Sequence, residues 1–277
     1  MTETALPPLR DVIKRYELAA RKALGQHFLL DTNITDKIAR ISGSLKDINV
    51  IEIGAGPGGL TRSLLKSDAK CVYAVEKDER CIAALNDLKQ VYGDRLVIIP
   101  ADALEISLVE LLPAPRAIIA NLPYNVGTPL LINWLDDIAK DSSAYVFLTL
   151  MFQKEVAMRL IAEANSKQYG RLSVMTQWLC DTEHCFDLPP GAFAPPPKVT
   201  STVVKLKPFA KPHYAADKKA LESTLAAAFG NRRKMLRSSL TTVSDDSVGW
   251  LTRAEIDPTR RAETLSVEEF CRLAMAR

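Results

Sequence analysis

The sequence predicts an α/β fold built on a doubly wound parallel sheet, followed by a small all-helical domain. Short apolar runs alternate with segments long enough for crossover helices, a glycine-rich turn follows the first run, and strand signals cease near residue 208. The apolar runs cover residues 48–53, 71–75, 96–99, 117–120 and 145–150. Because continuous, mostly β-branched runs suit strands covered on both faces, we expect all five in the centre of a Rossmann-like sheet.

The segments before the first strand are expected to be helical. Residues 10–22 have the pattern of a basic helix, and residues 32–42 that of a second helix. Asp31 or Thr32 can cap the start of the second helix, and Gly43 is suited to end it.

The pattern changes after about residue 170. Residues 171–180 are ambiguous between helix and strand, and residues 188–199 hold too many prolines for regular structure. Residues 201–207 alternate in polarity as a strand does, and only helical patterns follow. We therefore expect a large α/β domain over residues 1–207 and a helical domain over residues 208–277.

Composition limits the class of protein. The 277 residues are 47% hydrophobic and 25% charged, as in ordinary soluble globular proteins. No stretch approaches the roughly 18 uninterrupted apolar residues of a membrane span. The N-terminal segment has acidic residues and lacks the apolar core of a signal peptide, so we expect a cytoplasmic protein without a membrane partner.

The five cysteines match neither a disulfide framework nor a zinc-binding pattern. Cys180, His184 and Cys185 are close in sequence, but a second ligand pair of the usual spacing is lacking. We interpret the cysteines as reduced core thiols and expect no metal.

Charge is unevenly distributed along the chain. Residues 198–277 contain 15 Lys and Arg against 9 Asp and Glu, a net +6, whereas residues 1–197 contain 21 against 24, a net −3. A basic C-terminal segment favours a polyanionic partner, although basic faces are often merely solvated.

A glycine-rich turn follows the first predicted strand in VIEIGAGPGGL, residues 50–60. Gly54, Gly56 and Gly59 satisfy G-x-G-x-x-G, in which glycine lets the backbone turn tightly and approach a ligand closely. By itself the motif fits NAD, FAD or S-adenosylmethionine.

Acidic residues end the next two predicted strands. Glu76 is placed to accept hydrogen bonds from both hydroxyls of a ribose, and Asp102 could bind an adenine amine. Since ligands of open α/β sheets collect at the carboxyl ends of the strands, this ordered set predicts a nucleoside-binding site.

The fourth predicted strand ends in Asn121-Leu122-Pro123-Tyr124, which resembles the (Asp/Asn)-Pro-Pro-Tyr signature of amino-group methyltransferases. An adenine N6 amine is a poor nucleophile because its lone pair is delocalised. The Asn121 side-chain oxygen and the Leu122 carbonyl can hold its two N–H groups and aim that lone pair. Pro123 stiffens the loop, and Tyr124 can stack on a flipped-out base. Positioning and electrostatics would then supply most of the catalysis.

With these motifs, nearly the whole chain resembles the bacterial small-subunit ribosomal RNA adenine dimethyltransferases, the KsgA family. The resemblance is carried by residues 24–31, 52–61, 121–125, 152–160, 166–174, 193–204 and 229–240, with Glu76 and Asp102. It implies S-adenosylmethionine as methyl donor and S-adenosylhomocysteine as product. It also implies two methyl transfers to each of two adjacent adenosines, in a hairpin loop near the 3′ end of 16S RNA, within a maturing subunit. We expect a monomer.

The resemblance also implies further site residues. His27 and Leu29 would line the donor site with Gly54, Gly56, Glu76, Asp102 and Asn121. Phe193 would form the second aromatic wall around the target adenine. The family commonly has asparagine at the position of His27, so the contact of His27 with the donor can be through its side chain or its backbone. Residues 1–207 would bind the donor and catalyse, and residues 208–277 would bind the RNA.

A basic cluster stands out in the helical region, formed by Arg232, Arg233, Lys234 and Arg237. At helical spacing Arg233 and Arg237 are one turn apart. We interpret the cluster as a set of RNA phosphate contacts, with a solvated helix start as the alternative.

Three other functions compete with this interpretation. An Erm-type methyltransferase of large-subunit RNA would share the glycine loop and the acceptor motif, but residues 193 onward favour the small-subunit enzyme. A non-catalytic ribosome-assembly factor would not need both motifs intact. A dinucleotide-dependent oxidoreductase would not need the acceptor motif at all.

Overall fold

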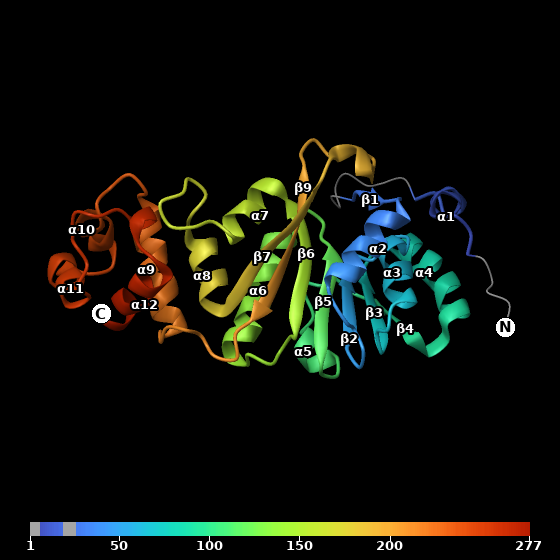
Figure 1. Ribbon diagram of the computed structural model, residues 1–277, viewed down its shortest axis with the longest axis horizontal. Helices are drawn as coiled ribbons and strands as arrows, with labels where there is room; N and C mark the ends of the chain where they lie inside the picture. The colour runs from blue at the N-terminus through green and yellow to red at the C-terminus, as the bar shows by residue number, and fades with distance from the viewer. Residues whose placement is uncertain (1–5, 19–25) are drawn as a thin grey trace. The chain divides into compact units, whose positions relative to one another are not determined.

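The computed structural model describes residues 6–18 and 26–277 (Figure 1). Its central element is a seven-stranded sheet with the strand order β4-β3-β2-β5-β6-β9-β7. These strands are β2 (Asn49–Ile53), β3 (Cys71–Glu76), β4 (Leu96–Pro100), β5 (Arg116–Asn121), β6 (Phe147–Gln153), β7 (Cys180–Leu188) and β9 (Ser201–Pro208). The predicted Rossmann-like α/β sheet is confirmed, and each of the five apolar runs forms one of its strands.

The sheet is parallel over β4, β3, β2, β5 and β6, as expected, and becomes antiparallel at β9. β2 pairs in parallel with both β3 and β5, and β4 and β6 extend the parallel part on either side. β9 then pairs antiparallel with β6, so the sheet is mixed. The strand order changes direction between β2 and β5, and the carboxyl ends of strands at such a switch point are where ligands bind.

β4 does not lie in the centre of the sheet, as its apolar sequence predicted. It is an edge strand with β3 as its neighbour, and residues 97–99 are half-buried. β2, by contrast, lies between two strands and is buried throughout. An apolar run therefore identified the strand but not its position in the sheet.

In the described residues up to 160, seven α-helices accompany the strands. They are α1 (Leu9–Arg15), α2 (Thr32–Ile41), α3 (Gly59–Lys66), α4 (Glu79–Tyr92), α5 (Leu108–Leu111), α6 (Gly127–Lys140) and α7 (Lys154–Leu160). The Asp31 side chain accepts the Asn33 N–H at the start of α2, and Gly43 follows its end with φ +91°, as predicted. α1 ends at Arg15, earlier than predicted, and residues 19–22 of that expected helix lie outside the described residues.

The proline-dense segment contains short regular elements, contrary to expectation. Pro190–Ala192 forms one 3-10 turn, and β8 (Phe193–Ala194) pairs antiparallel with β1 (Phe28–Leu29). The prolines are compatible with these elements. Pro190 is the first residue of the 3-10 turn, and a two-residue strand pairing needs few N–H donors. The ambiguous segment before it resolves into α8 (Arg171–Leu179), with β7 directly following.

The chain divides into two compact units. The first comprises residues 1–157 and 183–207, and the second residues 158–182 and 208–277. One break lies near residue 207, and residues 158–182 group with the C-terminal helices. Within the second unit the Trp178 Nε1–H donates to the Tyr214 carbonyl (2.9 Å), a contact that links α8 to the C-terminal segment.

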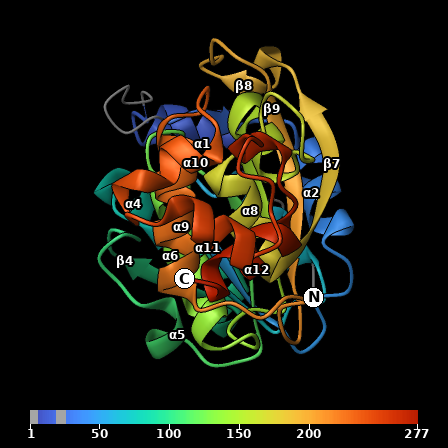
Figure 2. The same ribbon diagram turned by 90° about the vertical axis from the view of Figure 1, so that its left-hand side faces the viewer.

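The second unit is helical over its C-terminal part, as predicted. Figure 2 shows α8, α9 (Lys218–Gly230), α11 (Ser247–Arg253) and α12 (Val267–Met275) gathered together. The short helix α10 (Leu236–Ser239) follows α9 after a turn. Trp250 and Phe270 are fully buried in this unit. Among the described residues of the whole chain, no helix is long and apolar enough to cross a membrane.

Candidate active site

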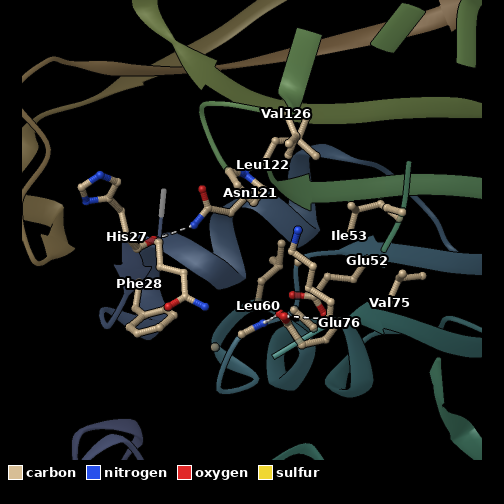
Figure 3. Close-up of a pocket in the computed structure, with 18 of the residues that line it drawn as sticks. His27, Phe28, Glu52, Ile53, Leu60, Val75, Glu76, Asn121, Leu122 and Val126 are labelled. Atoms are coloured by element: carbon tan, nitrogen blue, oxygen red, sulfur yellow. Dashed lines mark hydrogen bonds between the residues drawn. The ribbon is translucent and has the colours of Figure 1, made fainter. Parts of the chain in front are cut away.

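One pocket in the first unit collects most of the predicted site residues (Figure 3). It lies at the carboxyl ends of β2, β3, β4 and β5, on the side of the sheet where the switch point predicts it. Its lining includes the glycine loop, Glu76, Asp102 and the whole of residues 121–124. His27 and Leu29, from the segment around β1, complete it.

The glycine loop needs glycine at two positions for conformational and steric reasons. Gly54 and Gly56 have φ values of +67° and +55°, which side chains disfavour. A Cβ on Gly54 would lie 3.3 Å from the Pro123 ring, and one on Gly56 would lie 3.2 Å from the Phe28 ring. The loop therefore lies directly against the acceptor motif, so the two predicted motifs form one site.

Glu76 is buried and holds the glycine loop. One carboxylate oxygen accepts the Gly56 N–H (2.8 Å), and the other accepts the N–H groups of Lys77 and Asp78 (both 2.9 Å). A carboxylate offers about four acceptor sites, so capacity remains for a ribose hydroxyl. Sequence reasoning assigned Glu76 to the ribose but missed its contact with the loop.

Asp102 lies beyond β4 at the edge of the pocket. Its carboxylate accepts the Leu104 N–H (3.0 Å) and pairs with the Lys77 ammonium (2.9 Å). These hydrogen bonds, that of Leu104 first, lower the pKa of Asp102. The side chain is therefore an ionised acceptor, which suits the predicted contact with an exocyclic amine.

Glu52 is a lining residue that sequence reasoning missed. It lies in β2, it is 2% exposed, and its Oε2 finds no hydrogen-bond partner among the described residues. Burial raises the pKa of Glu52 to about 8, against hydrogen bonding from Thr61 and with help from the negative charge of Glu76. The signal that could have identified it is an acid inside the otherwise apolar run 48–53.

Asn121 ends β5 with its side chain fixed in orientation. Its Nδ2 donates to the main-chain carbonyl of His27 (3.1 Å), and Figure 3 shows the side-chain oxygen turned away from that bond. Because a carbonyl can only accept, the amide nitrogen must face His27. The Asn121 oxygen is thereby presented as a hydrogen-bond acceptor.

The rest of the acceptor motif is held from both sides. Leu122 is buried, and the Pro123 carbonyl accepts the N–H groups of Val126 and Gly127 in the turn before α6. The Tyr124 hydroxyl lies 2.5 Å from Ser201 Oγ on β9. Burial raises the pKa of Tyr124, so the ring is a neutral phenol at physiological pH.

His27 reaches this motif by its side chain as well as its backbone. Its ring lies with its centroid 5.2 Å from that of Tyr124 and with Nδ1 2.8 Å from the Pro195 carbonyl oxygen. In Figure 3 the ring points away from Glu76 and Val75.

Phe193 is not among the residues that line the pocket with Tyr124. It is 5% exposed in the core of the first unit, pairs with Leu29 across β1 and β8, and lines a second pocket between α1, α2 and α3. The role as second aromatic wall, which the resemblance implied, stays a prediction. The His27 ring, rather than Phe193, lies beside Tyr124.

The predicted basic cluster lies in the second unit but not on one helix. Arg232, Arg233 and Lys234 are in the turn between α9 and α10, and Arg237 is in α10. The expected one-turn spacing is therefore wrong, because Gly230 ends α9 before the cluster begins. Arg232 donates to the Ser166 carbonyl (3.1 Å), whereas the other three are exposed.

The cysteine-histidine segment considered as a metal site is distributed along β7. Cys180 is buried, and burial raises the pKa of its thiol to about 12. The His184 ring lies 3.0 Å from an Asp187 oxygen. Within residues 6–18 and 26–277, no group of three or more His, Cys, Asp or Glu is arranged to hold a metal ion.

Comparison with known proteins identifies the family. The family model described as ribosomal RNA adenine dimethylase matches residues 17–276. The chain is 55% identical over 270 residues to the ribosomal RNA small subunit methyltransferase A of Allorhizobium ampelinum, covering 97% of each protein. It is 52% identical to the protein of the same name from a Ruegeria species, covering 97% of this chain and 96% of the relative.

Solved structures agree with this assignment. A dimethyladenosine transferase from Plasmodium falciparum matches with a TM-score of 0.75 and 25% identity, over 89% of this chain and 96% of the other. The 23S rRNA methyltransferase ErmE matches with a TM-score of 0.66, also at 25% identity, over 90% and 98%. The chain belongs to the ribosomal RNA adenine dimethylase family.

Proposed function

We propose that this protein dimethylates the N6 amines of two adjacent adenosines in a hairpin loop near the 3′ end of 16S ribosomal RNA, within an immature small subunit. The observation that carries the proposal is the fixed Asn121 amide, which presents an acceptor oxygen in the pocket that also holds the glycine loop and Glu76. Relatives named for the small subunit resemble this chain at 52–55% identity, against 25% for ErmE. That difference favours the small subunit over the large one.

The pocket fits S-adenosylmethionine as methyl donor. Gly54 and Gly56 let the loop lie close against Pro123 and Phe28 at the pocket wall, and Glu76 retains capacity to accept from a ribose. Glu52 adds a buried carboxyl with one oxygen that has no partner in the described part of the chain, and a positively charged ligand would stabilise this carboxyl in its ionised form. When bound, S-adenosylmethionine supplies an electrophilic methyl group on a positively charged sulfur.

The acceptor residues prepare the adenine amine for attack. The Asn121 oxygen and the Leu122 carbonyl accept its two N–H groups, which favours a pyramidal nitrogen with its lone pair directed at the methyl carbon. Tyr124 stacks on the extruded base, as aromatic rings do for flipped nucleotides. Positioning of this kind can contribute about 7–11 kcal/mol of the barrier when reacting atoms are held in near-attack geometry.

The transfer forms one N–C bond as the S–C bond breaks, and the electron pair of that bond stays on sulfur. The new ammonium then loses a proton to water. Because an N-alkylated adenine ammonium is strongly acidic, the site needs no separate general base. Asn121 can still accept the remaining N–H for the second transfer to the same nitrogen.

The direct test is methyl transfer to purified 30S subunits that lack the modification, with labelled S-adenosylmethionine and nucleoside analysis of the RNA. Unmodified 50S subunits serve as the matched substrate control. We expect N6,N6-dimethyladenosine at two adjacent positions of 16S RNA and no label in 50S subunits. Label confined to 50S RNA would favour an Erm-type enzyme, and no label in either would indicate a non-catalytic factor.

A further inference from the structure

We propose that His27 is a positioning residue for the acceptor half of the site, which is formed by residues 121–124. The His27 backbone fixes Asn121, and the His27 ring fixes Tyr124. This inference rests on the proposed function, since it concerns how the methyl-accepting base is held. Three contacts of one residue carry it: one to β5, one to the segment after β8, and one to the ring of the acceptor motif.

The first contact sets which atom of Asn121 faces the base. The His27 carbonyl accepts the Asn121 Nδ2–H at 3.1 Å. If that carbonyl moved, the amide could rotate and present N–H groups to an amine that itself needs acceptors. The position of residue 27 therefore controls the acceptor geometry of Asn121.

The second contact attaches the His27 ring to the chain just beyond β8. In the antiparallel pairing of β1 with β8, Phe28 lies opposite Ala194, which places residue 27 opposite Pro195. Pro195 has no N–H to continue the ladder. The His27 ring lies with Nδ1 2.8 Å from the Pro195 carbonyl oxygen, which is free of the restriction on the proline nitrogen. Since the carbonyl only accepts, Nδ1 carries the proton in this bond.

The third contact fixes the Tyr124 ring between two points. The His27 ring packs against it at a centroid separation of 5.2 Å and an interplanar angle of 33°. At the other end, the Tyr124 hydroxyl is bonded to Ser201. A ring held at its hydroxyl and on its side keeps one plane, which a stacked base requires. The His27 ring thus acts on Tyr124, while only its backbone lies toward the donor side.

Two substitutions separate the ring's two contacts. His27→Phe keeps a ring against Tyr124 but loses the bond to Pro195, and His27→Ala loses both. His213→Ala is the matched control, because His213 also packs on an aromatic ring, that of Phe209 (4.2 Å), but in the second unit. Each variant is tested as the full chain for donor affinity by calorimetry, melting temperature, and single-turnover transfer to unmodified 30S subunits.

We expect His27→Ala to slow single-turnover transfer by about tenfold or more, since small misplacement of reacting groups has effects of that order. His27→Phe should fall between His27→Ala and wild type. Donor affinity should stay within about twofold, because the ring does not face the donor. His27→Ala should also release more N6-monomethyladenosine, since the monomethylated amine keeps one N–H and depends more on Tyr124. A purely structural role would not change that product ratio.

Wild-type rate and product ratio in either His27 variant would overturn the inference. So would an equal loss in His213→Ala, or a loss that appears only as weaker donor binding. If His27→Ala does not fold, the folded His27→Phe decides through its product ratio alone. Wild-type protein that labels no RNA would instead refute the proposed function itself.

Discussion

The two halves of the pocket are held in different ways. In the donor half, the buried Glu76 accepts three main-chain N–H groups, one from Gly56 in the glycine loop and two from Lys77 and Asp78, which directly follow it. In the acceptor half, Asn121 and Tyr124 are held by contacts from segments far along the chain, at His27 and Ser201. Backbone contacts at strand ends make the donor half a property of the sheet, whereas the acceptor half depends on distant segments, through the His27 carbonyl and ring and the Ser201 hydroxyl. Substitutions in the acceptor half should therefore impair methyl transfer, and substitutions in the donor half should impair donor binding.

The largest effect is expected in the acceptor half. Asn121→Ala should reduce methyl transfer by about two to three orders of magnitude, comparable to the loss of one preorganised hydrogen-bonding group. Single-turnover assays at saturating donor measure this. Asn49→Ala is the matched control, because Asn49 also donates to a carbonyl, that of Pro113, but at the start of β2. A wild-type rate for Asn121→Ala would remove it from the acceptor site.

Alanine substitutions of Tyr124 and Phe193 should affect different properties, RNA methylation in the first case and stability in the second. Phe193→Ala should cost about 3–5 kcal/mol of unfolding free energy, the usual cost of truncating a buried phenylalanine. Tyr124→Ala should instead weaken use of the RNA by about 1–3 kcal/mol, the worth of one base–aromatic stack. Denaturant unfolding and RNA methylation kinetics are measured on both. A stable Phe193→Ala with selectively impaired methylation would restore its role as an aromatic wall.

In the donor half, Glu76→Ala should weaken donor binding by about 1.5–3 kcal/mol, the range for hydrogen bonds to a charged group. Its melting temperature should also fall, since the Gly56 N–H loses its partner. Glu76→Gln is the informative companion: all three main-chain partners are donors, so an amide NH₂ fits poorly among them. Unchanged calorimetric affinity in both variants would mean that another residue holds the ribose.

A smaller effect is expected from the exposed part of the basic cluster. Replacing Arg233, Lys234 and Arg237 by neutral residues should lower affinity for the 30S particle by about tenfold and flatten its dependence on salt, because fewer counterions are released. Arg232→Ala is the contrast, since Arg232 already binds the Ser166 carbonyl and should affect melting temperature instead. An unchanged salt slope in the folded triple variant would exclude phosphate contacts.

The smallest effect concerns Glu52 and pH. Its folded-state pKa of about 8 lies above the roughly 4.3 of an exposed glutamate. The stability it contributes is therefore complete below about pH 4.3 and is lost as pH rises through about 8. Relative to Glu52→Gln, wild type should lose about 1 kcal/mol or more of unfolding free energy between about pH 5 and 9.

Urea unfolding at both pH values measures this difference, with Glu105→Gln on the exposed surface as control for the substitution itself. Saturating donor should reduce the pH dependence, because its positive charges stabilise the ionised carboxylate. A difference that stays constant with pH would show that Glu52 is ionised throughout.

The same contrast explains what could be predicted from the sequence. Apolar runs and strand-end motifs are local signals, and they identified five strands, the glycine loop, Glu76, Asp102 and residues 121–124. They could not predict that Glu52 lines the pocket, because one acid in a buried strand does not reveal which way it faces. The pairing of β1 with β8 could not be predicted either, since it consists of two residue pairs that are 166 and 164 positions apart in the chain. That pairing is what moves Phe193 into the core and His27 beside Tyr124.

One crossed measurement tests directly that the two halves act separately. Single-turnover methylation of unmodified 30S subunits is followed against donor concentration for wild type, Glu76→Ala and Asn121→Ala. Saturating donor should return Glu76→Ala to near the wild-type rate, and it should leave Asn121→Ala slow by about 100-fold or more. Rescue of Asn121→Ala by donor, or a Glu76→Ala rate that stays low at saturation, would contradict the division of the site into donor and acceptor halves.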